Sequence, residues 1–384
     1  MKKVYFDSAA TTKLRDEVIN CITEVLKTEY GNPSSTHSYG RSSKSLLENA
    51  RKDIAKILNV TASEIIFTSG GTEADNLILI SAVRDLKVKR IISSRIEHHA
   101  VLHTLEWLEK REDITVEYVN LTECGYVDYE HLENLLSNST EKTLVSLMHV
   151  NNEVGNLLDL KRVALLCKQN NALFHSDTVQ SVGHFELDFS EIQVDFATAA
   201  AHKFHGPKGA GFAFIRKNSG LRSLIHGGEQ ERGMRAGTEA VYAIAGMAEA
   251  LKLSYQHLDA EREFITQLKE YFKTKLLENI PGVKFNGGCD TNGRSTYTLL
   301  NVCLPISAEK SMLLLFQLDL KGIACSKGSA CQSGSEGGSH VLKQILSEED
   351  LAKPSLRFSL SSFNTTEEID YVVDTLKEFI EDGQ

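Results

Sequence analysis

Short apolar stretches alternate with helix-length amphipathic stretches along residues 65–176 of this chain. Strands are expected at residues 65–68, 90–93, 115–119, 143–149 and 172–176, and helices at 42–58, 72–83, 99–109, 129–136 and 160–169. Buried apolar strands that alternate with helices form mainly parallel sheets with helices on both faces. The pattern therefore predicts an α/β fold.

The length of 384 residues suits two domains. A long helical pattern at 241–278 leads out of the α/β region, and strands are expected beyond it near 283–285, 298–302 and 355–358, with a last helix at 366–381. We expect a large domain at residues 15–261. A small domain would combine residues 1–14 with 262–384.

Composition excludes several classes of protein. The net charge is −10, from 42 basic and 52 acidic residues without a long basic cluster, which argues against nucleic acid as a partner. No apolar run of about 18 residues indicates a membrane span, and the first residues do not read as a signal peptide. The seven cysteines are scattered without zinc-type spacing, so we expect no metal site, and reduced thiols in the cytoplasm.

One corner of the chain, AAAHKFHGPKGAG at residues 199–211, holds an unusual lysine. Lys203 lies between two apolar strands, at 194–200 and 211–215, beside His202 and a turn rich in glycine. A partly desolvated lysine in such a corner can have a lowered pKa and form a Schiff base with a carbonyl. A solvated turn lysine is the alternative from these residues alone.

Polar residues follow the expected strands. The TSGGTE stretch at 68–73 opens a helix, so its free amides and the Thr72 hydroxyl can bind a phosphate, or Thr72 can simply cap the helix. Asp177 falls at a strand end, where ligands bind in open α/β sheets, and could pair with a ring nitrogen or cap a helix. Gln180 could donate to a ring oxygen. His98 could stack on a planar ring, or be solvated.

Two further candidates lie in the second region. Arg357 is a lone cation in an apolar strand, suited to a substrate carboxylate or to a structural salt bridge. The stretch GSACQSGS at 328–335 has too few apolar side chains to be buried, so we expect it to expose Cys331 as a nucleophile. Cys325, at the end of a short expected strand, is expected to be structural.

These stretches together resemble the cysteine desulfurases of the nitrogen-fixation and iron–sulfur-cluster-assembly type, in the class V aminotransferase family. The resemblance covers nearly the whole chain. Its motifs are YFDSAATT (5–12), GNPSSTH (31–37), TSGGTEADN (68–76), EHHAVL (97–102), HVNNEVG (149–155), Asp177 with Gln180, AHKFHGPKGAG (201–211), HGGEQERGMRAGT (226–238), GSACQSGS (328–335) and SLRFS (355–359).

The resemblance implies a fold type I enzyme, with a seven-stranded, mainly parallel sheet in the large domain and a smaller α+β domain. It implies pyridoxal 5'-phosphate as cofactor, L-cysteine as substrate, a homodimer, and a sulfur-acceptor protein such as an iron–sulfur scaffold. By the resemblance, Lys203 forms the Schiff base and Cys331 accepts sulfur as a persulfide. The other implied roles are cofactor binding by Gly71, Thr72, His98, Asn152, Asp177, Gln180, His202 and, across the dimer, Thr238, catalysis by His98, and substrate carboxylate binding by Asn152 and Arg357.

Two alternatives stay open. A selenocysteine lyase or another β-lyase could have the same fold. A scaffold that binds the cofactor without turnover is the second alternative, because Ala200 replaces the family's usual phosphate-binding serine and Glu229 a usually small residue.

Overall fold

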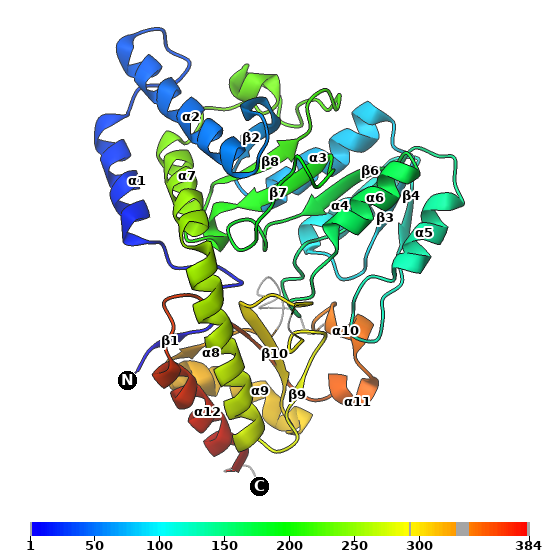
Figure 1. The fold of residues 1–384 in the computed structure, drawn as a ribbon, viewed down its shortest axis with the longest axis vertical. Helices are drawn as coiled ribbons and strands as arrows, with labels where there is room; N and C mark the ends of the chain where they lie inside the picture. Colours follow the sequence, from blue (N-terminus) through cyan, green and yellow to red (C-terminus); the bar gives the residue numbers. More distant parts are fainter. Residues whose placement is uncertain (1, 292, 328–337, 382–384) are drawn as a thin grey trace.

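The computed structural model describes residues 2–291, 293–327 and 338–381. Figure 1 shows two bodies, an upper one built around a large sheet and a lower one in which both ends of the described chain lie. None of the described helices is long and apolar enough to cross a bilayer.

The upper body contains a seven-stranded sheet. Its strands, in spatial order, are β2 (Ile65–Thr68), β8 (Gly211–Ile215), β7 (Phe196–Ala200), β6 (Leu173–Asp177), β5 (Thr143–Ser146), β3 (Arg90–Ser93) and β4 (Thr115–Tyr118). Only β8 runs antiparallel to its neighbours, β2 and β7. The predicted mainly parallel α/β fold is confirmed. The expectation that strand 115–119 is buried is wrong, because β4 lies at the edge of the sheet and is partly exposed.

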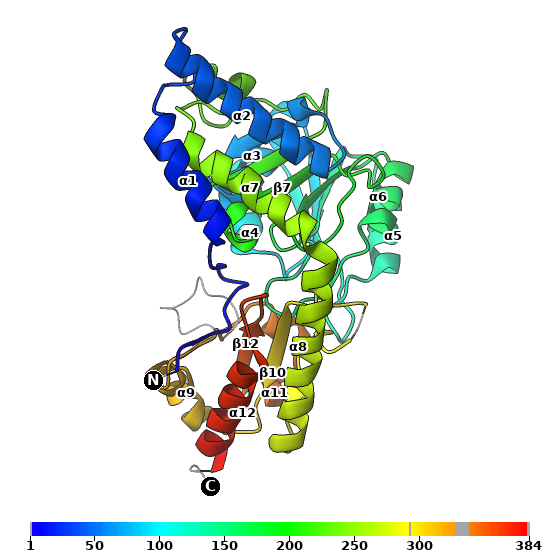
Figure 2. The ribbon, with the colours of Figure 1, turned by 60° about the vertical axis from the view of Figure 1, so that its left-hand side comes forward.

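Helices cover both faces of this sheet, as Figures 1 and 2 show. One hydrophobic core joins the sheet to α1 (Asp16–Thr28), α2 (Ser38–Ile57), α5 (Tyr129–Ser137), α6 (Leu160–Gln169) and α7 (Val241–Gln256). A second core, on the other face, joins it to α3 (Gly71–Leu86) and α4 (His99–Arg111). Both faces of the strands other than β4 are therefore buried, which explains their continuous apolar sequences.

The lower body has its own core. It contains an antiparallel sheet of β12 (Ser355–Ser359), β10 (Leu299–Cys303) and β9 (Lys284–Phe285), and a parallel pair of β1 (Val4–Tyr5) and β11 (Ile323–Ala324). Its helices are α8 (Leu258–Asn279), α9 (Ala308–Leu320), α10 (Leu342–Ile345), α11 (Glu348–Leu351) and α12 (Thr366–Glu381). In both views α8 and α12 lie side by side.

The structure corrects the expected helices in two places. The pattern at 241–278 is not one helix, because α7 and α8 meet at His257, whose backbone has φ −106° and ψ 6°. Helices α1, α9, α10 and α11 were not predicted. The division into domains at 15–261 and at 1–14 with 262–384 stays a prediction.

The N-terminal segment belongs to the core of the lower body. Strand β1 pairs with β11, and Asp7 bridges Ser359 of β12. The Phe6 side chain is fully buried, with its ring centroid 5.6 Å from that of Phe272 and 6.3 Å from that of Phe358. Because Phe6 is anchored in this core, the residues that follow it, Ala9 and Ala10, lie beside Lys203 at the end of β7.

Replacement of Phe6 tests this anchoring. Phe6→Ala leaves a cavity between two rings and should lower the free energy of unfolding by about 3–5 kcal/mol, measured by denaturant titration. The exposed Lys3 gives a control, because Lys3→Ala should change stability by less than about 0.5 kcal/mol. Equal stability of the two variants would show that the segment is not part of the core.

Candidate active site

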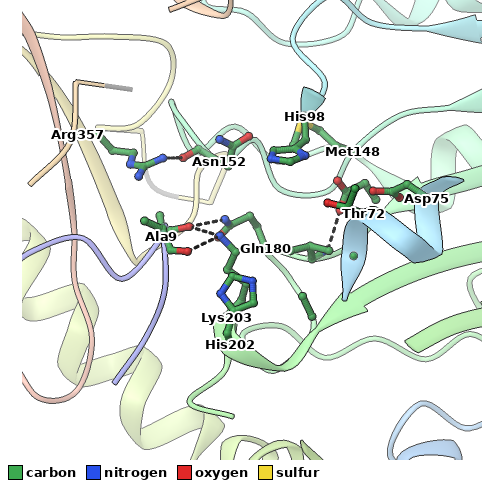
Figure 3. A pocket seen from close by; sticks show the side chains of 15 residues that line it. Ala9, Thr72, Asp75, His98, Met148, Asn152, Gln180, His202, Lys203 and Arg357 are labelled. Carbon is green, nitrogen blue, oxygen red and sulfur yellow. Dashed lines mark hydrogen bonds between the residues drawn. The ribbon is translucent and has the colours of Figure 1, made fainter. Parts of the chain in front are cut away.

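A cavity of about 220 Å³ lies where the carboxyl ends of the large-sheet strands face the lower body. Figure 3 shows Thr72 and Asp75 at one end of it and Arg357 at the other. Its walls come from the N-terminal segment, the segments after β2, β3, β5, β6 and β7, and β12. The lining residues are Ala9, Ala10, Gly71, Thr72, Asp75, His98, Met148, Asn152, Asp177, Val179, Gln180, Ala200, His202, Lys203 and Arg357.

The N-terminus of α3 forms one end of the cavity. Gly70 adopts a φ of +154°, and the helix begins at Gly71. As in any helix, the first amides of α3 have no intrahelical partners. A Cβ on Gly71 would lie 2.5 Å from Val179 Cγ2, so a side chain does not fit there. This end of the cavity suits an anion such as a phosphate, with Thr72 beside it.

Lys203 and Gln180 meet at the N-terminal segment. Strand β7 ends at Ala200, and one turn of 3-10 helix (Ala201–Lys203) directs the lysine into the cavity. Lys203 Nζ donates to the carbonyl oxygens of Ala9 at 2.6 Å and Ala10 at 2.9 Å, and Gln180 Nε2 donates to Ala9 O at 2.9 Å. The amine is thus presented to the cavity by backbone carbonyls (Figure 3).

Asp177 is a buried carboxyl group at the end of β6. Its Oδ1 accepts a hydrogen bond from Val179 N at 3.0 Å. Burial is the largest cause that raises the pKa of Asp177 to about 7. An ionised Asp75 would add to this rise, and Val179 N–H, His175 and Lys203 oppose it with smaller effects. A cationic ring nitrogen beside this carboxyl would be stabilised strongly, because little water screens the pair.

Two histidines contribute neutral imidazoles. His98 caps α4 and its Nδ1 accepts a hydrogen bond from Ala100 N at 3.1 Å. Burial, with a smaller effect from Lys203, lowers the pKa of His98 to about 4, and the same two causes lower the pKa of His202 to about 4. His202 Nδ1 is buried without a hydrogen-bond partner among the described residues, so it is available to a bound group.

Arg357 forms a structural salt bridge and also lines the cavity. Its side chain is 1% exposed, and its Nη2 donates to Asp7 Oδ1 at 2.9 Å, which is the structural salt bridge. Its Nη1 donates to Asn152 O at 2.9 Å at the cavity wall, while its Nε has no partner among the described residues. Asn152 and Arg357 thus sit together at the end opposite α3 (Figure 3).

The cavity brings together all but two of the expected site residues. Thr238 is exposed and does not line the cavity of its own chain, so its expected role across a dimer stays a prediction. Cys331 lies outside the described residues. The expected metal-free site stays a prediction too, although no cluster of metal-ligating side chains is found in the described ranges.

Several cavity residues were not anticipated. Ala9 and Ala10 contribute backbone carbonyls, which carry no side-chain signal, and only their place in the YFDSAATT motif pointed to them. Asp75 lies one turn into α3, where a spacing of four residues from Gly71 puts both on one helix face. That spacing could have identified it.

The fold and site define a member of the aminotransferase class-V family, whose model matches residues 4–372, and the chain belongs to this family. A relative named cysteine desulfurase IscS, from Dictyoglomus turgidum, is 40% identical over 382 residues, which cover 99% of this chain and 95% of the relative. The resemblance found in the sequence is confirmed.

Solved structures agree with the family. A NifS-like protein superposes with a TM-score of 0.90 at 34% identity, covering 99% of this chain and 100% of its own. A structure of SspA in complex with cysteine superposes with a TM-score of 0.81 at 29% identity, covering 94% of this chain and 100% of its own.

The close contact at Gly71 gives a test of the cavity wall. Gly71→Ala places a methyl group against the stiff Val179 side chain and should lower the free energy of unfolding by about 1–3 kcal/mol in thermal or denaturant melts. Adding Val179→Ala removes the clashing atom and should restore part of that loss. A Gly71→Ala variant as stable as the wild type would contradict the described packing.

Proposed function

We propose that this chain is a pyridoxal-phosphate-dependent cysteine desulfurase that converts L-cysteine to L-alanine and retains the sulfur as a persulfide on Cys331. The observation that carries the proposal is the cavity itself, in which the amine of Lys203, the buried carboxyl of Asp177 and the open N-terminus of α3 face one space. Relatives named cysteine desulfurase over nearly the full chain support it.

The lining fits this cofactor. The first amides of α3, the Thr72 hydroxyl and His202 Nδ1 would hold the phosphate, Asp177 would pair with the ring nitrogen, Gln180 with the ring oxygen, and His98 would stack on the ring. Pyridoxal phosphate, when bound, supplies an aldehyde that condenses with amines and a cationic ring that withdraws electrons. Because Ala200 offers no hydroxyl, the phosphate depends on fewer donors.

Substrate orientation would come from the lower body. Arg357 is held in place, because Asp7 and the Asn152 carbonyl each accept a hydrogen bond of 2.9 Å from one of its terminal nitrogens. A rigid guanidinium at the cavity wall can receive a substrate carboxylate together with Asn152. The amino acid would then lie between this end and Lys203.

Lys203 would act as the general base and acid. Its amine would take the proton from the substrate Cα and later return a proton on the way to alanine. His98 is neutral at pH 7, because burial holds its pKa at about 4, so its ring can stack without repelling a cation. Asp177 would keep the ring nitrogen protonated throughout.

Cys331 would form the new sulfur bond. Its thiolate attacks the substrate sulfur, the carbon–sulfur bond breaks, and the products are alanine and the Cys331 persulfide, so atoms and electrons balance without another reactant. The described residues on either side of the Cys331 stretch, Ser326 and His340, are held close to other segments of the chain. Ser326 exchanges backbone hydrogen bonds with Arg357, and His340 Nε2 lies 2.8 Å from Glu97 O. The five residues from Ser326 to Cys331 can span at most about 18 Å.

Cys325 is unsuited to the same task. Its thiol follows β11, and burial, with a smaller contribution from Asp7, raises its pKa to about 12. It is therefore almost wholly protonated near pH 7, and a thiol is a far weaker nucleophile than a thiolate.

A selenocysteine lyase or another β-lyase is the alternative on the same fold. The two differ in whether a protein thiol receives the chalcogen. Comparison of kcat/KM for L-cysteine and L-selenocysteine separates them, and a preference for selenocysteine with no persulfide would favour the lyase.

The partners are proposals that follow from the same resemblance. Thr238, exposed on its own chain, would reach the phosphate of a second copy in a homodimer. A sulfur-acceptor protein would receive the persulfide, and a cytoplasmic location stays a prediction.

Removal of the lysine tests the cofactor assignment. The purified protein should absorb visible light through bound pyridoxal phosphate, and Lys203→Ala should lose the wild-type absorbance band because the covalent link is gone. Lys208, in the same turn but exposed, is the matched control, and Lys208→Ala should keep the band. An unchanged band in Lys203→Ala would refute the assignment.

The two cysteines give a second test. Cys331→Ser should still bind cysteine, seen as a change in the visible spectrum, but lose about 100-fold or more of sulfide release, because a hydroxyl cannot accept sulfur. Cys325→Ser should retain most activity. Mass spectrometry should find the persulfide on the Cys331 peptide, and the reverse pattern, a live Cys331→Ser and a dead Cys325→Ser, would overturn the role of Cys331.

A further inference from the structure

The end of the cavity formed by α3 contains a carboxyl group, Asp75, that has no role in the proposed reaction. This end of the cavity, together with Asp177, is called the cavity floor below. Asp75 lies on α3 one turn after Gly71 and is 1% exposed. It lines the cavity, yet its Oδ1 has no hydrogen-bond partner among the described residues. A buried carboxyl group that is incompletely paired destabilises a fold, so its protonation state needs a physical account.

His175 provides the missing partner. Its Nε2 lies 3.4 Å from Asp75 Oδ1 and is itself buried without a hydrogen bond among the described residues. The other ring nitrogen, Nδ1, lies 2.9 Å from the Ser146 hydroxyl. Two unsatisfied polar atoms that face each other at this distance are both satisfied if one proton lies between them.

The surroundings favour a neutral pair over an ion pair. Burial raises the pKa of Asp75 to about 8 and lowers the pKa of His175 to about 4. The charged or chargeable groups nearby include Asp177 on β6, Glu97 after β3 and the cation of Lys203. His98 and His202 also line the cavity and are neutral, because burial lowers the pKa of each to about 4. If Asp75 and Glu97 were both ionised, their charges would repel that of Asp177, because little water screens them. Protonation of these two carboxyl groups removes the repulsion.

We propose that Asp75 is a neutral carboxylic acid that donates its proton to His175 Nε2, and that this pair positions Asp177 as the ionised carboxylate of the cavity floor. His175 then donates from Nδ1 to Ser146, which fixes the tautomer of the ring. Asp75 is a positioning residue, since it acts through its neighbours.

Thr198 connects this pair to Asp177. Its hydroxyl lies 3.5 Å from Asp177 Oδ1 and is also within hydrogen-bonding range of Asp75. With Asp75 neutral, the hydroxyl can donate to Asp177, the one acceptor that carries charge. Asp177 thus receives two donors, Thr198 Oγ1 and Val179 N, which hold its carboxylate in one orientation.

Infrared spectroscopy of the full chain labelled with ¹³C-aspartate tests the proposal without any ligand. At pH 7 the wild type should show the carbonyl band of a buried protonated aspartate. Asp75→Asn should lose the Asp75 component of this band and keep only the partial band of Asp177, whose pKa is raised to about 7. Asp177→Asn should keep the Asp75 component, and Glu97 does not interfere because glutamate is unlabelled. If Asp75→Asn does not fold, the wild-type and Asp177→Asn spectra still decide.

The titration of Asp177 gives the second readout. An asparagine at position 75 can still donate to His175, so Asp75→Asn should leave the pH midpoint of the Asp177 band unchanged. A midpoint that falls by about one unit would show that Asp75 is charged in the wild type and would overturn the proposal. The absence of a protonated band in Asp177→Asn at pH 7 would overturn it as well.

Stability gives a third readout. The pKa of Asp75 is raised in the folded state, so its contribution to stability is present at low pH and is lost as the pH rises through about 8. Asp75→Asn should therefore lose less stability than the wild type between pH 7 and pH 9, and an equal loss would contradict the raised pKa.

The role given to Asp177 rests on the proposed function, whereas the infrared and stability tests use the protein alone. The two can therefore fail separately. An unchanged visible band in Lys203→Ala would refute the cofactor assignment and leave the state of Asp75 untouched.

Discussion

The burial of ionisable side chains around one cavity between two bodies determines most of what this protein can do. In that space, burial is the largest cause of the raised pKa of Asp177 and of the lowered pKa values of His98 and His202. In water these groups would titrate within their ordinary ranges. Around the cavity, a carboxyl group and two neutral imidazoles therefore face one space, and in the proposed function they bind a cationic, phosphate-bearing cofactor.

The cavity lies between one edge of the large sheet and the lower body. A parallel sheet places the carboxyl ends of its strands at one edge, and β2, β6 and β7 are each followed by residues that line the cavity. The lower body covers that edge and contributes Arg357 and the carbonyls of Ala9 and Ala10. The N-terminal segment is thus part of the site, because the core around Phe6 holds it there.

The sequence predicts those parts of the site that follow a strand. Lys203, Asp177 and the turn before Thr72 are recognisable because apolar strands precede them and helix or turn signals follow. The role of the Ala9 carbonyl has no side-chain signal, because its position depends on the pairing of β1 with β11, more than 300 residues away in the chain. The break at His257 was also missed, since no proline or glycine marks it in the sequence.

In the proposed reaction, the substrate sulfur passes to a protein thiol while the carbon skeleton leaves as alanine. Product analysis of a single turnover, with enzyme in excess over L-cysteine and no reductant, tests it most directly. Alanine should form in an amount equal to the sulfur bound on the protein, with no free sulfide. Pyruvate and ammonia, or alanine accompanied by free sulfide and no bound sulfur, would contradict it.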